Sequence, residues 1–165
     1  MPPPPGFSPQ HSHRTKVEPL SSLQSLTIED LIEEFEHLAD WEERCDFLID
    51  LGFELPEFPP EEKTEANRVH GCQSLVWLVA EVKPGDPPVI EIRADSDAMI
   101  VKGLIAVLLT LFSGKTPGEI LETDAEAVFA RLGLDRHLST TRRNGLYGMM
   151  QRVREIASAN LTSDL

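Results

Sequence analysis

Cysteine and aromatic residues are scarce in this 165-residue sequence, which has two cysteines, two tryptophans, one tyrosine and seven phenylalanines. Two cysteines cannot build the disulfide network of a small secreted domain, and no signal with a basic start and an apolar centre stands at the N-terminus. We therefore expect an intracellular, cytoplasmic protein with reduced thiols at Cys45 and Cys72, although a single disulfide between them stays formally open.

Long apolar runs and basic residues are also lacking. The longest apolar stretch, 103–112, falls short of the ~20 residues that span a bilayer, so it predicts a buried helix and no membrane segment. Only 15 Lys and Arg stand against 28 Asp and Glu, and the formal net charge of −13 disfavours nucleic acid and anionic membranes. A protein partner with basic patches fits this charge, as does an acidic surface that only confers solubility.

The remaining composition is that of one globular domain behind a proline-rich tail. Hydrophobic residues make up 41% and charged residues 26% of the chain, and its length suits one core. Residues 1–23 are rich in proline and have no apolar periodicity, which predicts a disordered tail. We assign the folded domain to residues 24–160 and a short C-terminal tail to residues 161–165.

Apolar spacing and turn residues predict two blocks of helix around a small sheet. A capped helix from Thr27 to Leu38 and a second from Asp40, with Gly52 as its C-cap, form a hairpin that carries Cys45 in a packing role. Three strands follow, around 67–70, 74–82 and 89–94, as an antiparallel meander. Further helices are expected at 98–112, after Thr116, at 125–132 and after residue 142. Strands clustered between helical blocks indicate the α+β class.

The most distinctive local feature is Cys72, which directly follows Gly71 at the mouth of a predicted strand. A thiol on such a turn can be presented to another molecule, and Arg68 and His70 could lower its pKa. A buried structural cysteine explains the same pattern equally well. His70 and Cys72 alone do not make a metal site, because no CxxC pair is present and a closed site needs four ligands.

Two other polar clusters have simple structural interpretations. Asp95 and Asp97 are expected to cap the central helix, with a catalytic acid–base pair as the weaker alternative. Arg142 and Arg143 mark the start of the last helix, where they could also bind an anion or steady a thiolate.

Several separated motifs, in order and with compatible spacing over about 26–159, give the sequence a more specific character. They are Asn67-Arg68-Val69-His70-Gly71-Cys72-Gln73-Ser74-Leu75-Val76-Trp77, Ala94-Asp95-Ser96-Asp97-Ala98, Ile100-Val101-Lys102-Gly103-Leu104-Ile105-Ala106, Leu132-Gly133-Leu134, Leu138-Ser139 and Arg142-Arg143-Asn144-Gly145-Leu146. Together they resemble the SufE family of sulfur acceptor proteins.

The resemblance implies a fold and an activity. The fold would be α+β, related to IscU-type scaffolds, here with a three-stranded antiparallel sheet. The activity would be to accept persulfide sulfur from a SufS-like cysteine desulfurase, to stimulate that enzyme, and to deliver the sulfur for iron–sulfur cluster assembly. The family's acceptor cysteine maps to Cys72, and its supporting aspartate and arginine map to Asp97 and Arg142.

The resemblance also implies the partners and the cofactor use. The partners would be the desulfurase and an iron–sulfur scaffold complex, with no nucleic acid and no membrane, and a homodimer is allowed. Pyridoxal phosphate belongs to the desulfurase, so this chain is expected to bind no cofactor and no metal. It would be a covalent sulfur-transfer accessory protein and not a stand-alone enzyme.

Two points stay open from the sequence. We expect Leu75, Val76 and Trp77, with the central helix, to form an apolar pocket that shields the Cys72 side chain at rest. The alternative function is that of an acidic protein-binding adaptor with a purely structural Cys72, and a thiol hydrolase is a distant third.

Overall fold

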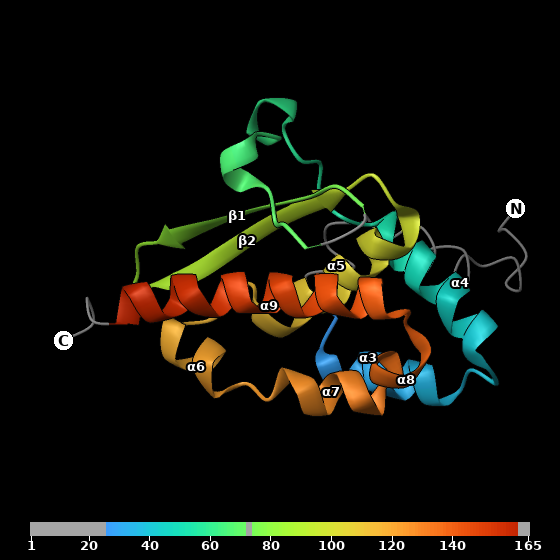
Figure 1. Ribbon diagram of the computed structural model, residues 1–165. Coiled ribbons are helices and arrows are strands. Elements are labelled where there is room, and N and C mark those ends of the chain that lie inside the picture. The colour runs from blue at the N-terminus through green and yellow to red at the C-terminus, as the bar shows by residue number, and fades with distance from the viewer. Residues whose placement is uncertain (1–25, 72–73, 162–165) are drawn as a thin grey trace, which may run out of the picture.

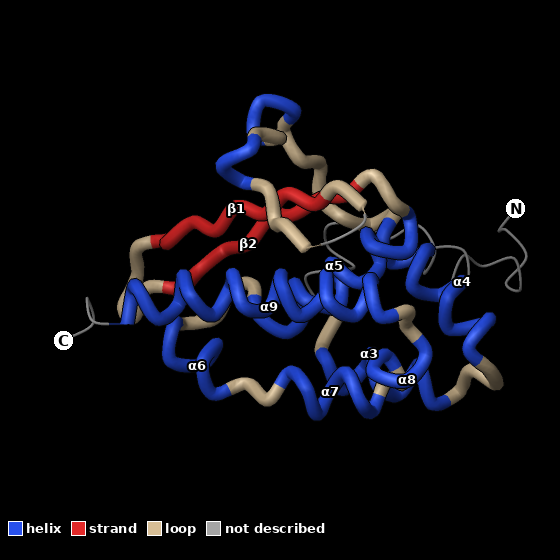
Figure 2. Tube along the Cα trace, in the orientation of Figure 1, coloured by secondary structure: helices blue, strands red, loops and turns tan. Residues whose placement is uncertain are grey.

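The fold is α+β, and the computed structural model describes it for residues 26–71 and 74–161 (Figure 1). The predicted tail at 1–23 lies outside the described residues, as do Cys72, Gln73 and the last four residues of the chain. Figure 2 shows most of the helices gathered on one side of a two-stranded hairpin, with the short 3₁₀ turns of residues 60–67 on its other side.

The chain begins with the predicted helical hairpin. Helix α3, Ile28–Glu36, starts in a capping box in which Thr27 Oγ accepts from the Asp30 amide at 3.1 Å and Asp30 Oδ2 accepts from the Thr27 amide at 3.3 Å. Helix α4, Trp41–Gly52, starts at Asp40, whose carboxylate accepts from the Glu43 amide at 3.0 Å. Both predicted helices are confirmed.

The sheet has two strands and not the three that were predicted. Strands β1, Val76–Lys83, and β2, Val89–Ser96, pair antiparallel. The expected strand around 67–70 is wrong: the short 3₁₀ helices η2, Pro60–Glu62, and η3, Glu65–Asn67, occupy this region, and only an isolated bridge joins Arg68 to Trp77. The Arg152 side chain donates hydrogen bonds to the Ala66 and Arg68 carbonyls. These two backbone acceptors are therefore satisfied without a neighbouring strand.

Helix α5, Met99–Phe112, is the predicted central helix and is buried along most of its length. It crosses α4 at two glycines. A Cβ on Gly103 would overlap the Leu48 carbonyl, and a Cβ on Gly52 would stand 2.8 Å from Lys102 Cβ. The predicted C-cap role of Gly52 is therefore wrong: Phe53 is the C-cap, in a right-handed conformation, and Gly52 is required for the close approach of the two helices.

The rest of the chain closes the helical side of the molecule. Thr116 and Glu119 cap α6, Pro117–Glu122, as predicted, and Gly133 ends the next helix with φ at +80°. The remaining helices are α7, Ala125–Arg131, α8, Leu134–His137, and the long α9, Thr140–Leu161. None of the helices in the described ranges is long and apolar enough to cross a membrane.

The core lies between the sheet hairpin and the helices. The inner face of the strands contributes Val76, Leu78, Ile90, Ile92 and Ala94, all buried. Helix α5 lies against β2 and α9, so the segments that flank Cys72 at the start of β1 lie close to the first turns of both helices (Figure 1).

Candidate functional site

Cys72 itself lies outside the described residues, but the segments before and after it are described. We call residues 66–71 the approach segment and residues 74–76 the return segment. Gly71 ends the approach segment with φ at +95°, a left-handed conformation that glycine adopts without strain. The predicted turn at Gly71 and Cys72 lies partly outside the described residues, of which Gly71 is the last before the gap.

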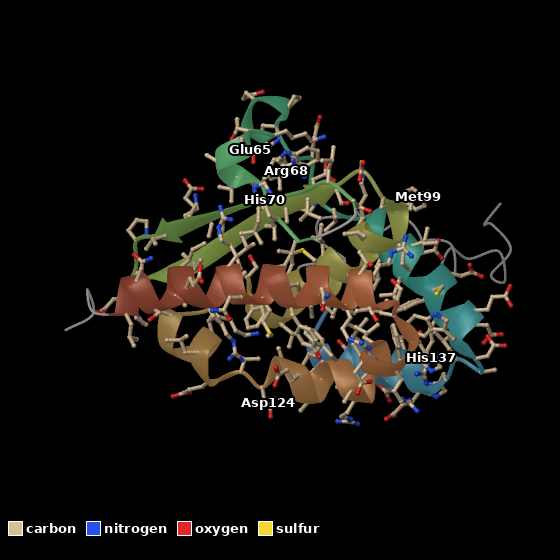
Figure 3. All side chains as sticks on the ribbon, in the orientation of Figure 1. Glu65, Arg68, His70, Met99, Asp124 and His137 are labelled. Carbon is tan, nitrogen blue, oxygen red and sulfur yellow. The ribbon has the colours of Figure 1, made fainter. Side chains whose placement is uncertain are left out.

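The approach segment is tied down by polar contacts on two sides. Glu65 pairs with His70 at 2.8 Å and with Arg68 at 3.6 Å, and these three side chains lie together in Figure 3. The Val69 amide donates to the Val76 carbonyl at 2.9 Å, which joins the approach segment to the first residue of β1. The backbone hydrogen bond ties the approach segment to the start of β1, and the exposed ion pairs add little to it.

The return segment is held by Asp97. Its Oδ1 accepts from the Leu75 amide at 3.0 Å, and its own amide donates to the Leu75 carbonyl at 3.3 Å. A carboxylate that accepts from a backbone amide makes one of the stronger kinds of hydrogen bond. Asp97 therefore lies directly beside the segment that follows Cys72.

The prediction that Asp95 and Asp97 cap the central helix is wrong. The N-cap of α5 is Ala98, which has no side-chain cap, and the Ala98 amide instead donates to Ser96 Oγ at 3.2 Å. The Asp95 carboxylate pairs with Lys63 at 3.3 Å and with Lys102 at 3.5 Å. Asp95 thus pairs with a lysine near the start of α5, and Asp97 binds the return segment, so neither carboxylate accepts from an amide at the start of the helix.

Arg142, in the first turn of α9, lies near the return segment. Its amide donates to Ser139 Oγ at 3.2 Å, and its side chain is exposed. A small pocket open to solvent is lined by Ser74, Val101, Leu104, Thr141, Arg142, Gly145, Leu146 and Met149. The structure therefore brings Arg142 and the return segment to the rim of one pocket, with an apolar floor from α5 and α9.

The expected shielding pocket of Leu75, Val76 and Trp77 has a different form. Val76 is fully buried in the core, whereas Leu75 is 37% exposed. Trp77 points to the opposite face of the sheet, where Lys63 Nζ lies 5.2 Å from the centre of its ring. Neighbouring residues of a strand face opposite sides, so these three cannot line one pocket.

Cys45, to which the sequence assigned a packing role, lies half-buried in α4. Burial raises the pKa of its thiol above the ordinary value, and the carboxylates of Asp46 and Glu42 raise it further. The positive charge of Arg142 acts in the opposite direction and lowers it. The balance keeps the Cys45 thiol protonated at neutral pH, and a protonated thiol is a poor nucleophile.

Charge is distributed very unevenly along the chain. Residues 26–62 hold 14 of the 28 acidic residues and one of the 15 basic residues, Arg44. The other 14 acidic and 14 basic residues balance, so the net charge of −13 belongs to the region of α3 and α4. Within the described ranges, no group of three or more His, Cys, Asp or Glu side chains is arranged to hold a metal ion.

Asp97 and Arg142 thus lie beside the return segment of an α+β scaffold, and known proteins are similar to this chain over most of its length. Residues 29–157 match the family described as SufE, Fe-S metabolism associated domain. An uncharacterized SufE-like protein of Rhizobium etli is 44% identical over 133 residues, which cover 79% of this chain and 89% of that protein. A second uncharacterized SufE-like protein, from Rhizobium meliloti, is 40% identical over 136 residues, covering 82% of this chain and 97% of that protein. This chain belongs to the SufE family.

One polar residue beside the site was not found from the sequence. Arg152 on α9 donates to the carbonyls of Arg68 and Ala66 in the approach segment. Its partners are backbone atoms 84 and 86 residues away in the chain, so no side-chain motif marks them. Its ten-residue spacing from Arg142 is not a helical repeat, so spacing did not mark it either.

Proposed function

We propose that this protein is a sulfur carrier whose Cys72 takes sulfur from the cysteine persulfide of a cysteine desulfurase and delivers it for iron–sulfur cluster assembly. Membership of the SufE family supports an association with iron–sulfur metabolism. The observation that carries the more specific proposal is the convergence on the return segment: Leu75 is bonded to Asp97, and Ser74 shares a pocket with Arg142.

The transfer step balances without an added oxidant or reductant. The Cys72 thiolate attacks the terminal sulfur of the donor persulfide, and the S–S bond inside the donor breaks as the new one forms. The donor cysteine leaves as a thiolate, and Cys72 keeps the sulfur as a persulfide. A cysteine thiolate on the scaffold then repeats the same exchange and returns Cys72 to its starting state.

Arg142 supports this reaction by its charge. The attacking thiolate and the persulfide are both anionic, and a nearby guanidinium favours anionic forms of sulfur. Arg142 is exposed and lines the pocket beside Ser74, so its side chain can serve the reacting sulfur without losing a structural contact. The charge therefore raises the fraction of reactive thiolate on Cys72.

Asp97 has a positioning role. One of its carboxylate oxygens accepts from the Leu75 amide. Its two hydrogen bonds with Leu75 set the direction in which the return segment leaves Cys72. Loss of the carboxylate would loosen one flank of the reacting residue.

The desulfurase is the first partner, and pyridoxal phosphate acts there and not on this chain. Removal of sulfur from the desulfurase cysteine frees that cysteine for the next turnover, which accounts for stimulation of the enzyme. This chain acts as an accessory protein in the cytoplasm, with an iron–sulfur scaffold as the second partner. The concentrated negative charge of residues 26–62 suits a partner whose facing surface is basic.

The two cysteines provide the test. A Cys72→Ser variant should take up no sulfur from a persulfidated desulfurase and should not stimulate its turnover, whereas Cys45→Ser should behave like the unchanged protein. Thermal unfolding of both variants controls for folding. Equal sulfur uptake by the two variants would contradict the proposal, and binding without any sulfur transfer would favour the adaptor function.

A further inference from the structure

The approach segment has an anchor on α9 to which no role has been assigned. The two terminal nitrogens of Arg152 donate to different carbonyls, Nη1 to Arg68 at 3.2 Å and Nη2 to Ala66 at 3.0 Å. A guanidinium has a fixed planar fork, so two acceptors held by one side chain are also held relative to each other. We call this pair of hydrogen bonds the Arg152 clamp.

A second contact brings α9 and the approach segment together one turn earlier. At Gly148, four residues before Arg152, an added Cβ would lie 3.6 Å from the His70 carbonyl oxygen and 3.7 Å from Val69 Cγ1. Positions four apart lie on the same face of a helix. One face of α9 therefore lies along the approach segment from residue 66 to residue 70.

The same helix also carries the residue proposed to serve the sulfur. Arg142 precedes Arg152 by ten residues, about 15 Å along the helix axis at 1.5 Å per residue. Gly145 and Met149 lie between them and line the pocket with Arg142. Helix α9 thus links the position of the approach segment to the position of the Arg142 charge.

We propose that Arg152 is a positioning residue for sulfur acceptance at Cys72: its clamp holds on α9 the approach segment that leads to this cysteine. This inference rests on the proposed sulfur-carrier function. Only two residues separate Gly71 from Ser74, so the two flanking segments limit where Cys72 can lie. Asp97 holds one flank and Arg152 holds the other.

The chain offers a closely matched control. Arg154 lies on the same helix two residues later, and its Nη2 donates to the Thr123 carbonyl at 2.8 Å, away from the approach segment. Both arginines are partly buried and both bind backbone carbonyls. Arg152→Ala and Arg154→Ala should therefore cost similar stability, while only the first releases the approach segment.

The first readout needs no partner. In Arg152→Ala, amide hydrogen exchange at Arg68 and Val69 should be about tenfold faster than in the unchanged protein, because the segment loses two charge-assisted hydrogen bonds. Arg152→Lys keeps the charge but not the fork, so it should restore only part of the protection. Unchanged exchange in Arg152→Ala, or equal acceleration in Arg154→Ala, would overturn the clamp.

The second readout is single-turnover sulfur transfer from a persulfidated desulfurase, measured at several concentrations of this protein. For Arg152→Ala we expect the saturating rate to fall about tenfold, with the half-saturating concentration within about twofold, because orientation changes and the docking surface does not. Faster amide exchange with an unchanged transfer rate would overturn the positioning role. Full rescue by Arg152→Lys would show that charge alone matters and would also overturn it.

The two readouts separate this inference from the proposed function. If the unchanged protein takes up no sulfur on Cys72, the sulfur-carrier function and the positioning role that rests on it both fail. The clamp itself is then judged by the exchange rates alone. If the unchanged protein accepts sulfur normally and Arg152→Ala does so too, only the positioning role is wrong.

Discussion

The surroundings of the two cysteines differ in both packing and charge. Cys45 sits within α4, a helix pressed against α5 by two glycines. Burial and the Asp46 and Glu42 carboxylates raise the pKa of its thiol, against the lowering effect of Arg142. The segments on either side of Cys72 bury Val69 and Val76 and are also held by hydrogen bonds and ion pairs, and the charged groups beside them include Arg68, Arg142 and Arg152. A thiol within a close-packed helix has a structural role, whereas a thiol between two hydrogen-bonded segments can be oriented for reaction.

The largest effect is expected at the helix crossing. Gly103→Ala places a methyl group against the Leu48 carbonyl, where α4 and α5 leave no room, so the free energy of unfolding should fall by about 3 kcal/mol. Gly118→Ala is the matched control, because an added Cβ there meets nothing within 4 Å, and it should change stability by less than about 1 kcal/mol. Urea unfolding of both variants measures the difference, and equal stabilities would show that the crossing is not tightly packed.

The next effect concerns the charge beside the Cys72 flanks. Arg142→Ala should slow sulfur uptake about tenfold at neutral pH, because less of the acceptor thiol is ionised. Arg142→Lys keeps the positive charge and should recover most of the rate. The rate is measured in a Cys45→Ser background by rapid quench. If the alanine variant takes up sulfur as fast as the lysine variant, the positive charge of Arg142 does not support the transfer.

A smaller effect is expected at the return segment. Asp97→Ala removes the acceptor of the Leu75 amide and should cost about 1 kcal/mol of stability. Asp97→Asn keeps an acceptor oxygen and should cost less. Amide exchange at Leu75 follows the change locally, and it should accelerate in the alanine variant. Full protection of that amide without the carboxylate would show that Asp97 does not hold the segment.

The smallest effect is a shift in reactivity at Cys45. Its raised pKa means that less thiolate is present at a given pH than in an unfolded chain, so alkylation of folded Cys72→Ser should be slower near pH 8. As the pH rises, the rate should keep increasing beyond the point at which the urea-unfolded protein levels off. Coincident pH profiles for the folded and unfolded protein would contradict the assignment.

Local sequence signals predicted the helices well, because their determinants are short in range. The capping residues Thr27, Asp40 and Thr116 each act within three residues of their helix starts. The false third strand and the true role of Gly52 depend on contacts between distant parts of the chain. Arg152 binds the Arg68 carbonyl, 84 residues earlier in the chain. Gly52 of α4 contacts Lys102 of α5, about 50 residues later, which is about the length of a small domain.

The candidate site shows the same division. Motifs pointed to Cys72, Asp97 and Arg142, and the structure places Asp97 and Arg142 beside the return segment. The manner of their contacts was not predictable, because Asp97 binds a backbone amide 22 residues away, just before β1, and not the nearby helix end. Backbone partners carry no sequence signature, so a structure is needed to find them.

The most direct test of the sulfur-carrier function is mass spectrometry of this protein after incubation with a cysteine desulfurase and free cysteine. If Cys72 is the sulfur acceptor, the mass should increase by one sulfur atom. Peptide mapping should locate this sulfur on the peptide that contains Cys72, and a thiol reductant should remove it. Added sulfur on the Cys45 peptide alone, or no added sulfur while the desulfurase turns over, would contradict the sulfur-carrier function.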